Sequence, residues 1–94
     1  MSEQWTFLTN HGHVLVCLAS DTGARLRDVA QRVGITERAV QQIIADLEDG
    51  GYVVKSRAGR RNQYQVRRAG RFRHPLESQV RVGEFLDLVS AREG

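Results

Sequence analysis

The sequence lacks most of what covalent cross-links, metal sites and membrane spans require. Its 94 residues include one cysteine, Cys17, which can form no disulfide within the chain and offers no cysteine pair to a metal ion. The longest uninterrupted apolar run, at 14–19, covers six residues, whereas a helix that crosses a bilayer needs about 20. The first four residues lack the basic flank and the apolar stretch of a secretory signal. We therefore expect a cytoplasmic protein with no membrane partner.

Patterns of catalytic and metal sites are also missing. No nucleophile stands beside a candidate base, and the sequence has no carboxylate pair and no glycine-rich phosphate loop. His11 and His13 are two residues apart, so on a helix they diverge by about 200° and cannot easily share a metal ion. We expect His74, beside Pro75, to hydrogen-bond locally and Cys17 to be a small core residue. The sequence therefore predicts no enzymatic activity, no metal and no cofactor.

The basic residues are unevenly distributed along the chain. Residues 55–73 contain eight basic residues and no acidic one, whereas the rest of the chain contains six basic and eleven acidic residues. Thirteen of the fourteen basic residues are arginine, which suits bidentate contacts with phosphate or guanine. A local positive block on an otherwise acidic chain is typical of a surface that binds nucleic acid phosphates. A solvated charged face would give the same charge run.

Three helices are predicted in the first half of this single domain. Apolar residues at helical spacing give the ranges 10–20, 26–33 and 36–49. Thr9 and Thr36 are suitable caps for the first and third helices. Gly34 ends the second helix in the way that a left-handed C-terminal residue does.

The apolar period changes after the third helix, which ends at Gly50. Segments 52–56 and 63–67 have strand character, and the connection 57–62 carries a glycine, as in a hairpin. A last helix is expected from Pro75, which suits a first helical position, to about Ala91. The expected fold is therefore mainly α with a small β-hairpin, an α+β arrangement.

Segment 26–47 has the spacing of a helix-turn-helix. Ala30 is small where the two helices would cross, and Gly34 follows four residues later, where the turn needs a positive φ. Val40 follows as the first buried residue of the second helix. The other positions that this motif requires to be apolar are also apolar: Val29, Val33, Ile35 and Ile43. An ordinary corner between two helices would show only part of this pattern.

The segment Leu47–Val53, with its leucine, two glycines and apolar strand start, resembles the end of the recognition helix in MarR-like and ArsR-like winged repressors. A hairpin with a basic tip follows, as the wing does in those families. The resemblance covers about residues 10–67 and implies a winged helix-turn-helix fold, binding of double-stranded DNA and a homodimer. The chain is shorter than a typical MarR protein and lacks the cysteine motif of the ArsR sensors. We therefore expect neither a phenol-binding pocket nor metal sensing, and the effector stays open.

The resemblance also implies which side chains contact DNA. This motif puts the start of its second helix at the base edges of the major groove. The exposed positions there are Thr36, Glu37, Arg38, Gln41 and Gln42. Arg38 suits guanine, either glutamine suits adenine, and Glu37 suits cytosine N4. Thr36 suits a helix cap that also touches phosphate. Each of these side chains could instead be an ordinary solvated helix position.

The predicted wing tip carries four polar side chains, which are Arg57, Arg60, Arg61 and Asn62. Arginines on a narrow ribbon suit phosphate contacts or insertion into the minor groove. The alternative is a hairpin edge that its charges protect from aggregation. Four such groups exceed what protection needs, so we expect the wing to bind DNA.

The C-terminal helix is expected to form a dimer interface. Its apolar stripe consists of Val82, Phe85, Leu86 and Val89, with Leu76 and Val80 roughly opposite. We therefore divide the chain into a DNA-binding domain, 1–74, and a dimerisation helix, 75–94, although this helix could also be covered by its own domain. The predicted function is that of a dimeric, sequence-specific transcription regulator. A winged-helix protein-interaction module and an architectural or RNA-contacting basic protein are the alternatives.

Overall fold

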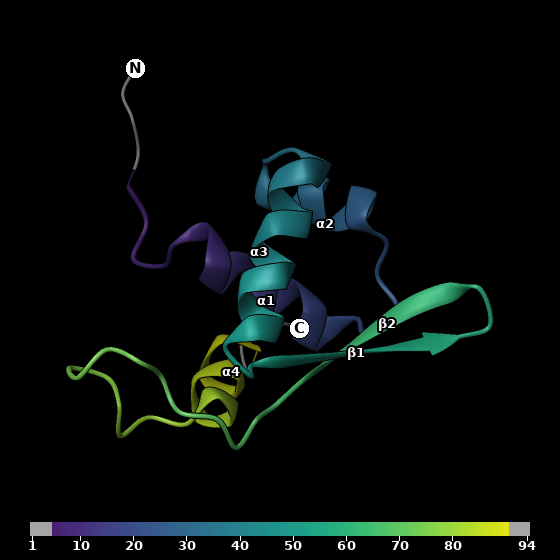
Figure 1. Ribbon diagram of the computed structural model, residues 1–94. Helices are drawn as coiled ribbons and strands as arrows, with labels where there is room; N and C mark the ends of the chain where they lie inside the picture. The colour runs from purple at the N-terminus through teal and green to yellow at the C-terminus, as the bar shows by residue number, and fades with distance from the viewer. Residues whose placement is uncertain (1–4, 91–94) are drawn as a thin grey trace.

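The computed structural model describes residues 5–90, which form four helices and one hairpin. Their order is α1 (Asn10–Ser20), α2 (Leu26–Val33), α3 (Glu37–Asp49), β1 (Val53–Ala58), β2 (Arg61–Val66) and α4 (Val82–Ser90). The helix, helix, helix, hairpin, helix order expected from the sequence is confirmed. Figure 1 shows the hairpin extending from the base of the helical bundle, with α4 beside that base. No helix within residues 5–90 has the length and apolar character that crossing a membrane requires.

The sequence predicted three signals at helix ends: Gly34 after α2, Thr36 before α3 and Thr9 before α1. The first two act as predicted. Gly34 has a φ of 88°, and its N–H donates to the carbonyl of Ala30 at 2.8 Å, which closes α2. Thr36 caps α3, because its Oγ1 accepts a hydrogen bond from the N–H of Ala39 at 3.0 Å. Thr9 occupies the cap position of α1, but its side chain makes no capping hydrogen bond. The burial of apolar residues on α1 therefore contributes more to its start than the predicted cap does.

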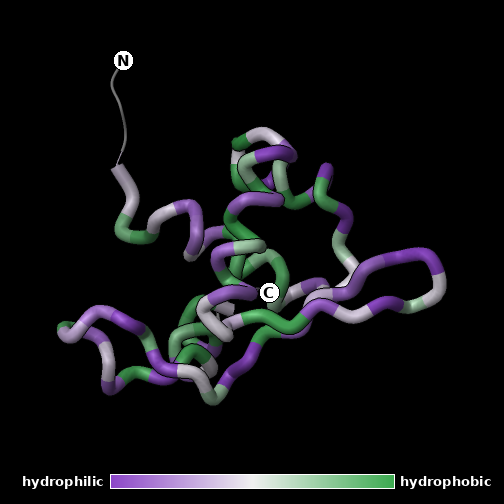
Figure 2. The backbone as a smooth tube through the Cα atoms, in the orientation of Figure 1, coloured by the Kyte–Doolittle hydropathy of each residue, from purple (hydrophilic) through white to green (hydrophobic). Residues whose placement is uncertain are grey.

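The core is built from one face of every helix and from the base of the hairpin. Its buried side chains are Val14, Leu15, Cys17, Leu18, Val29, Ala30, Val40, Ile43, Ile44, Leu47, Val53, Tyr64, Val82 and Leu86. In Figure 2 the apolar positions lie within the bundle and along α4, whereas the wing is mostly hydrophilic. The core thus fixes the directions of α2, α3 and the hairpin relative to one another, and Cys17 is a core residue as predicted.

The hairpin strands are longer than the sequence pattern indicates. Pairing runs from Val53↔Val66 to Ala58↔Arg61, which leaves a two-residue turn, Gly59–Arg60, instead of the predicted connection 57–62. Gly59 has a φ of 67° and Arg60 has no positive φ, as in a type II′ turn. The prediction was too short because the outer half of the hairpin projects into solvent, where no buried face imposes alternation.

The predicted start of the last helix was wrong. Residues 75–79 form turns, with the N–H of Glu77 bonded to the carbonyl of His74 at 2.9 Å, and α4 begins only at Val82. The carboxylate of Glu84 accepts a hydrogen bond from the N–H of Arg81 at 2.9 Å, the second half of a capping box. This contact, and not Pro75, marks the start of the helix. Its expected end near Ala91 lies outside the described residues.

Candidate nucleic-acid interface

One side of α3 remains open to solvent along its whole length. Val40, Ile43, Ile44 and Leu47 bury the opposite side. At 100° per residue, Arg38 and Gln42 lie on the line that points away from this core, and both are exposed. Glu37 and Gln41 lie together to one side of that line, one turn apart, and are exposed as well. Thr36 precedes them as the cap. The structure therefore brings the five residues predicted to contact DNA, four at the bases and Thr36 at a phosphate, to the exposed first two turns of α3.

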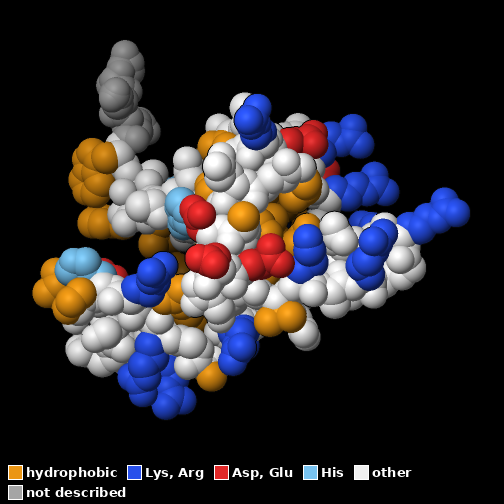
Figure 3. All heavy atoms as spheres, viewed as in Figure 1, with side chains coloured by type: hydrophobic (Ala, Val, Ile, Leu, Met, Phe, Trp, Pro, Cys, Tyr) orange, Lys and Arg blue, Asp and Glu red, His pale blue; other side chains and the backbone are white. Residues whose placement is uncertain are grey.

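The two ends of α3 differ in charge. Its last turn carries Asp46, Glu48 and Asp49, of which Asp46 and Asp49 are exposed. Figure 3 shows acidic side chains gathered over the lower part of α3, with basic side chains along the wing and beside the upper helices. Carboxylates repel phosphates, so only the first two turns of α3 suit the approach of a nucleic acid.

The wing presents its polar groups on two faces. Arg57 pairs with Asn62 across the strands, on the face that also carries buried Tyr64, whereas Arg61 pairs with Ala58 on the other face. Of the four residues predicted at the tip, only Arg60 lies in the turn. The others belong to the last pairs of the strands, and all four are exposed.

Arg61 has a structural contact that the sequence did not indicate. Its Nη2 donates to the carbonyl of Gly23 at 2.7 Å, and the N–H of Tyr64 donates to the carbonyl of Thr22 at 3.0 Å. These two bonds tie β2 to the loop between α1 and α2. The direction of the wing is therefore set by the helical bundle.

A hollow of about 460 Å³ lies where the wing, the start of α2 and the start of α3 meet. Three of the predicted site residues line it: Glu37, Arg61 and Asn62. Two further arginines, Arg25 and Arg27, line it from the start of α2. The first N–H groups of a helix have no acceptor within the helix and favour an anion, and Arg25 provides no side-chain cap there. Sequence reasoning missed both arginines, although their place at a helix N-terminus was a usable signal.

The histidines have local partners. His11 Nε2 lies 2.8 Å from Oδ2 of Asp46, which links α1 to α3. His74 Nδ1 accepts a hydrogen bond from the N–H of Leu76 at 3.1 Å, the local bond expected from the sequence. Within the described part of the chain, no three histidine, cysteine or acidic side chains gather as metal ligands do.

The residues predicted to form a dimer interface are divided by the structure. Val82 and Leu86 are 0% and 3% exposed and belong to the core of their own chain, so they are inaccessible to a partner. Phe85 and Val89 are half-buried, and Phe85 packs edge-to-face on Phe72. Leu76 and Val80 precede α4 and so lie on no face of it. The apolar stripe on α4 was identified correctly, but two of its four residues, Val82 and Leu86, pack within the domain.

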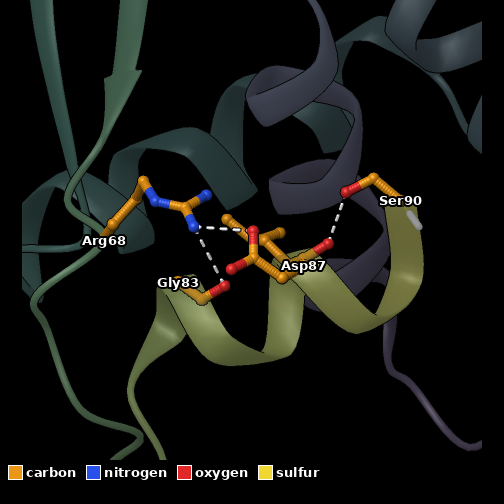
Figure 4. Close-up of polar contacts among 5 residues, drawn as sticks. Arg68, Gly83, Asp87 and Ser90 are labelled. Carbon is orange, nitrogen blue, oxygen red and sulfur yellow. Dashed lines mark hydrogen bonds and ion pairs between the residues drawn. The ribbon is translucent and has the colours of Figure 1, made fainter.

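Polar contacts also hold α4 to its own domain. Arg68 Nη2 donates to the carbonyl of Gly83 at 3.2 Å and to Oδ1 of Asp87 at 2.7 Å, as Figure 4 shows. The N–H of Gly83 returns a bond to the carbonyl of Arg68 at 2.9 Å. A Cβ on Gly83 would lie about 3.1 Å from the Arg68 side chain, so the two segments are in close contact. α4 is therefore part of the folded domain and not a separate appendage.

The comparisons agree with this geometry. Residues 8–54, half of the chain, match the family model for winged helix-turn-helix DNA-binding domains. The match covers α1, α2, the turn at Gly34, α3 and the first residues of β1. A comparison with curated proteins gives no match. With three packed helices, a capped and exposed α3 and a basic hairpin, the chain belongs to the winged helix-turn-helix DNA-binding family.

Proposed function

We propose that this protein is a cytoplasmic transcription regulator that binds double-stranded DNA with sequence specificity, as a homodimer and without catalysing a reaction. The observation that carries the proposal is the hollow lined by Arg25, Arg27, Arg61 and Asn62. There the starts of α2 and α3 and the wing meet, while the acidic end of α3 lies outside it. DNA binding by a winged helix needs this convergence of basic groups on one side.

The start of α3 would read the bases. Arg38 and Gln42 lie on its most exposed line, so they reach furthest into a major groove. Arg38 suits O6 and N7 of guanine, and Gln41 or Gln42 suits N6 and N7 of adenine. Glu37, which lines the hollow beside the wing, suits the amino group of cytosine. Both hydrogen-bonding and charged groups are present, which favours base reading over binding by charge alone.

The remaining basic residues would position the protein on the backbone. Arg60 at the tip of the wing suits the minor groove or its phosphates, and Arg57 with Asn62 suits a phosphate nearer the bundle. Arg25 and Arg27 at the start of α2 suit the phosphates at the edge of the major groove. Arg61, already bonded to Gly23, would brace the wing as well as add charge.

The likeness to MarR-like and ArsR-like repressors supports a dimeric regulator in particular. In a two-fold dimer, two α3 helices address half-sites about one turn of DNA apart. A single bound domain would read only a few base pairs, so pairing two domains raises both affinity and specificity. The proposal therefore includes a palindromic operator.

Binding to selected genomic fragments and to random duplexes, titrated with salt, tests this function. With about four phosphate contacts per subunit, log K should fall against log salt with a slope of roughly −3 to −4 per subunit. Selected fragments should bind at least about 10³-fold more tightly than random ones. A steep slope without sequence preference would indicate an architectural or RNA-contacting protein. Failure to bind any duplex would favour a protein-interaction module and contradict the proposal.

A further inference from the structure

A second concave surface lies away from the wing. It is a groove of about 650 Å³ between the N-terminal segment, α1, the last turn of α3 and the loop before α4. Figure 1 shows the N-terminal segment and this loop reaching out on the side of the molecule opposite to the wing tip. The proposed DNA contacts use none of the residues that line this groove.

The groove has an apolar floor and exposed apolar walls. Leu15 and Leu47 are buried at its floor, and Phe72 and Phe85 pack there edge-to-face with ring centroids 5.4 Å apart. On one wall, Phe7 is 91% exposed. Figure 3 shows apolar side chains on both sides of a notch, with histidine side chains near it.

The N-terminal wall ends in a pair of aromatic rings that extends into solvent. Trp5 is 77% exposed and contacts Phe7 edge-to-face, with ring centroids 5.0 Å apart. The loop that forms the opposite wall exposes Leu76 at 82%. Large aromatic side chains gathered beside an apolar groove are typical of an interface that a partner covers.

We propose that this groove binds a second copy of the chain, with the aromatic pair Trp5–Phe7 of each copy seated in the groove of the other. The inference rests on the homodimer in the proposed function and identifies its interface. The pair and the groove are adjacent on one side of the molecule. A two-fold axis between them therefore buries both pairs and both grooves at once, and the assembly closes at two copies.

The aromatic pair supplies a large part of the area that a stable dimer needs. Burying a tryptophan and a phenylalanine removes on the order of 300–400 Å² per copy from water. This is about half of the roughly 800 Å² that each partner contributes to a stable interface, and the groove and Leu76 supply more. The rim carries both signs of charge, with Asp46 and Asp49 on α3, and Arg73 and Glu77 on the loop. Two copies related by a two-fold axis can therefore pair opposite charges across the interface.

α4 offers a smaller surface. With Val82 and Leu86 in the core, Leu88, at 76% exposed, is its one large hydrophobic side chain that is mostly open to solvent within the described residues. A single exposed leucine does not make an interface. A dimer through the groove also keeps the wings at its outer ends, because the N-terminal segment and the loop that line the groove lie on the side opposite to the wing tip (Figure 1).

Sedimentation of three proteins tests the interface: the unchanged chain, Phe7→Ser and Leu88→Ser. Both substitutions remove one exposed apolar side chain, so neither disturbs the core, and circular dichroism checks that each variant is folded. We expect the unchanged chain and Leu88→Ser to be dimers at micromolar concentration. Losing an anchor residue raises the dissociation constant about 30-fold per site. A symmetric dimer contains the site twice, so Phe7→Ser should raise the dissociation constant of the dimer by about 10³-fold.

The fluorescence of Trp5 measures dimer formation independently, because Trp5 is the only tryptophan in the chain. Its emission should shift to shorter wavelength as the unchanged chain is concentrated, and should stay constant for Phe7→Ser. A parent chain that stays monomeric at high micromolar concentration would overturn the interface. Dissociation by Leu88→Ser alone would overturn it too, and would indicate α4.

The proposed function is judged separately, on a short duplex of random sequence. A monomeric parent chain that binds this duplex overturns the groove dimer and leaves DNA binding intact. A parent dimer that binds no duplex overturns the proposed function and leaves the interface intact. Phe7→Ser should bind the short duplex as tightly as the parent does, and should lose affinity only for an operator with two half-sites.

Discussion

Replacing Arg38 by alanine tests whether the start of α3 reads bases. Arg38 lies one residue after the start of the helix, on the line opposite to the buried side chains, and it is exposed. Within the described residues it makes no side-chain hydrogen bond that the fold would lose. We therefore expect the free energy of unfolding to change by less than about 0.5 kcal/mol, as for other surface substitutions.

The effect on binding should be much larger and confined to the operator. A bidentate contact from arginine to guanine discriminates by about 1–3 kcal/mol. This corresponds to a loss of about 5- to 150-fold for each half-site. Binding to random DNA should barely change, because the remaining arginines still neutralise phosphates. Arg25→Ala is the matched control: it removes an arginine next to α2, which we assign to a phosphate, and should weaken both kinds of DNA alike.

Fluorescence anisotropy on the operator and on a random duplex, at several salt concentrations, measures both effects. Arg38→Ala should leave the salt slope unchanged and should reduce the ratio of the affinity for the operator to the affinity for the random duplex. Arg25→Ala should leave this affinity ratio unchanged and lower the salt slope by about 1. If Arg38→Ala weakens both duplexes equally and lowers the slope, then Arg38 contacts phosphate, and our assignment of the base-reading line on α3 is wrong.

Three further predictions concern the wing, α4 and the turn. Replacing Arg57 and Arg60 together by alanine should weaken binding to all sequences and lower the salt slope by about 2; an unchanged slope would mean that the wing points away from DNA. Leu86→Ala should cost about 2–5 kcal/mol of unfolding free energy in urea at every protein concentration, since its side chain is buried within one chain; a concentration-dependent loss would instead indicate an intermolecular role. Gly34→Ala should lower the free energy of unfolding by about 1–2 kcal/mol, because alanine at a φ of 88° is strained. Gly34→Asn should lower it by less. An unchanged midpoint of thermal unfolding for Gly34→Ala would contradict this prediction.

The sequence predicted best those elements whose signals are local. The cap at Thr36 and the left-handed glycine at Gly34 each determine a helix end within a few residues, whatever the rest of the chain does. The buried stripe on α3, from Val40 to Leu47, could likewise be read from spacing alone. The helix-turn-helix was therefore predicted with its correct bounds, including the exposed residues at the start of α3.

The sequence predicted least well the segment between β2 and α4. Pro75 suits a first helical position, but the next six residues offer only Leu76 and Val80 to an apolar face, so a helix there would gain little from packing. The loop is closed by contacts between distant residues instead. The backbones of Arg71 and Arg81 form an isolated antiparallel β-bridge. The Tyr52 hydroxyl donates a hydrogen bond to the carbonyl of Arg71 at 2.7 Å. Pairings of this kind leave no periodic pattern in the sequence.

An apolar stripe alone also cannot tell which surface covers it. The spacing of Val82, Phe85 and Leu86 indicates a buried face equally well for a dimer and for a single domain. Their burial within the chain could be recognised only when α1 and the Arg68 segment were placed beside α4. The same limit applied to Arg61, whose bond to Gly23 joins residues 38 positions apart.

The two proposed surfaces meet on one helix. Arg38 and Gln42 lie near the start of α3, whereas Asp46, Leu47 and Asp49 lie on its last turns and line the groove. His11 bonds Asp46 across the same groove, which ties α1 to this end of α3. A partner seated in the groove would therefore contact the helix that reads the bases, about two turns from its start. Because α3 is a short, rigid element packed on the core, its two ends cannot reorient independently. An occupied groove would thus restrict how the start of α3 enters DNA, and the acidic last turn would stay at the centre of the dimer, away from the phosphates of the two half-sites.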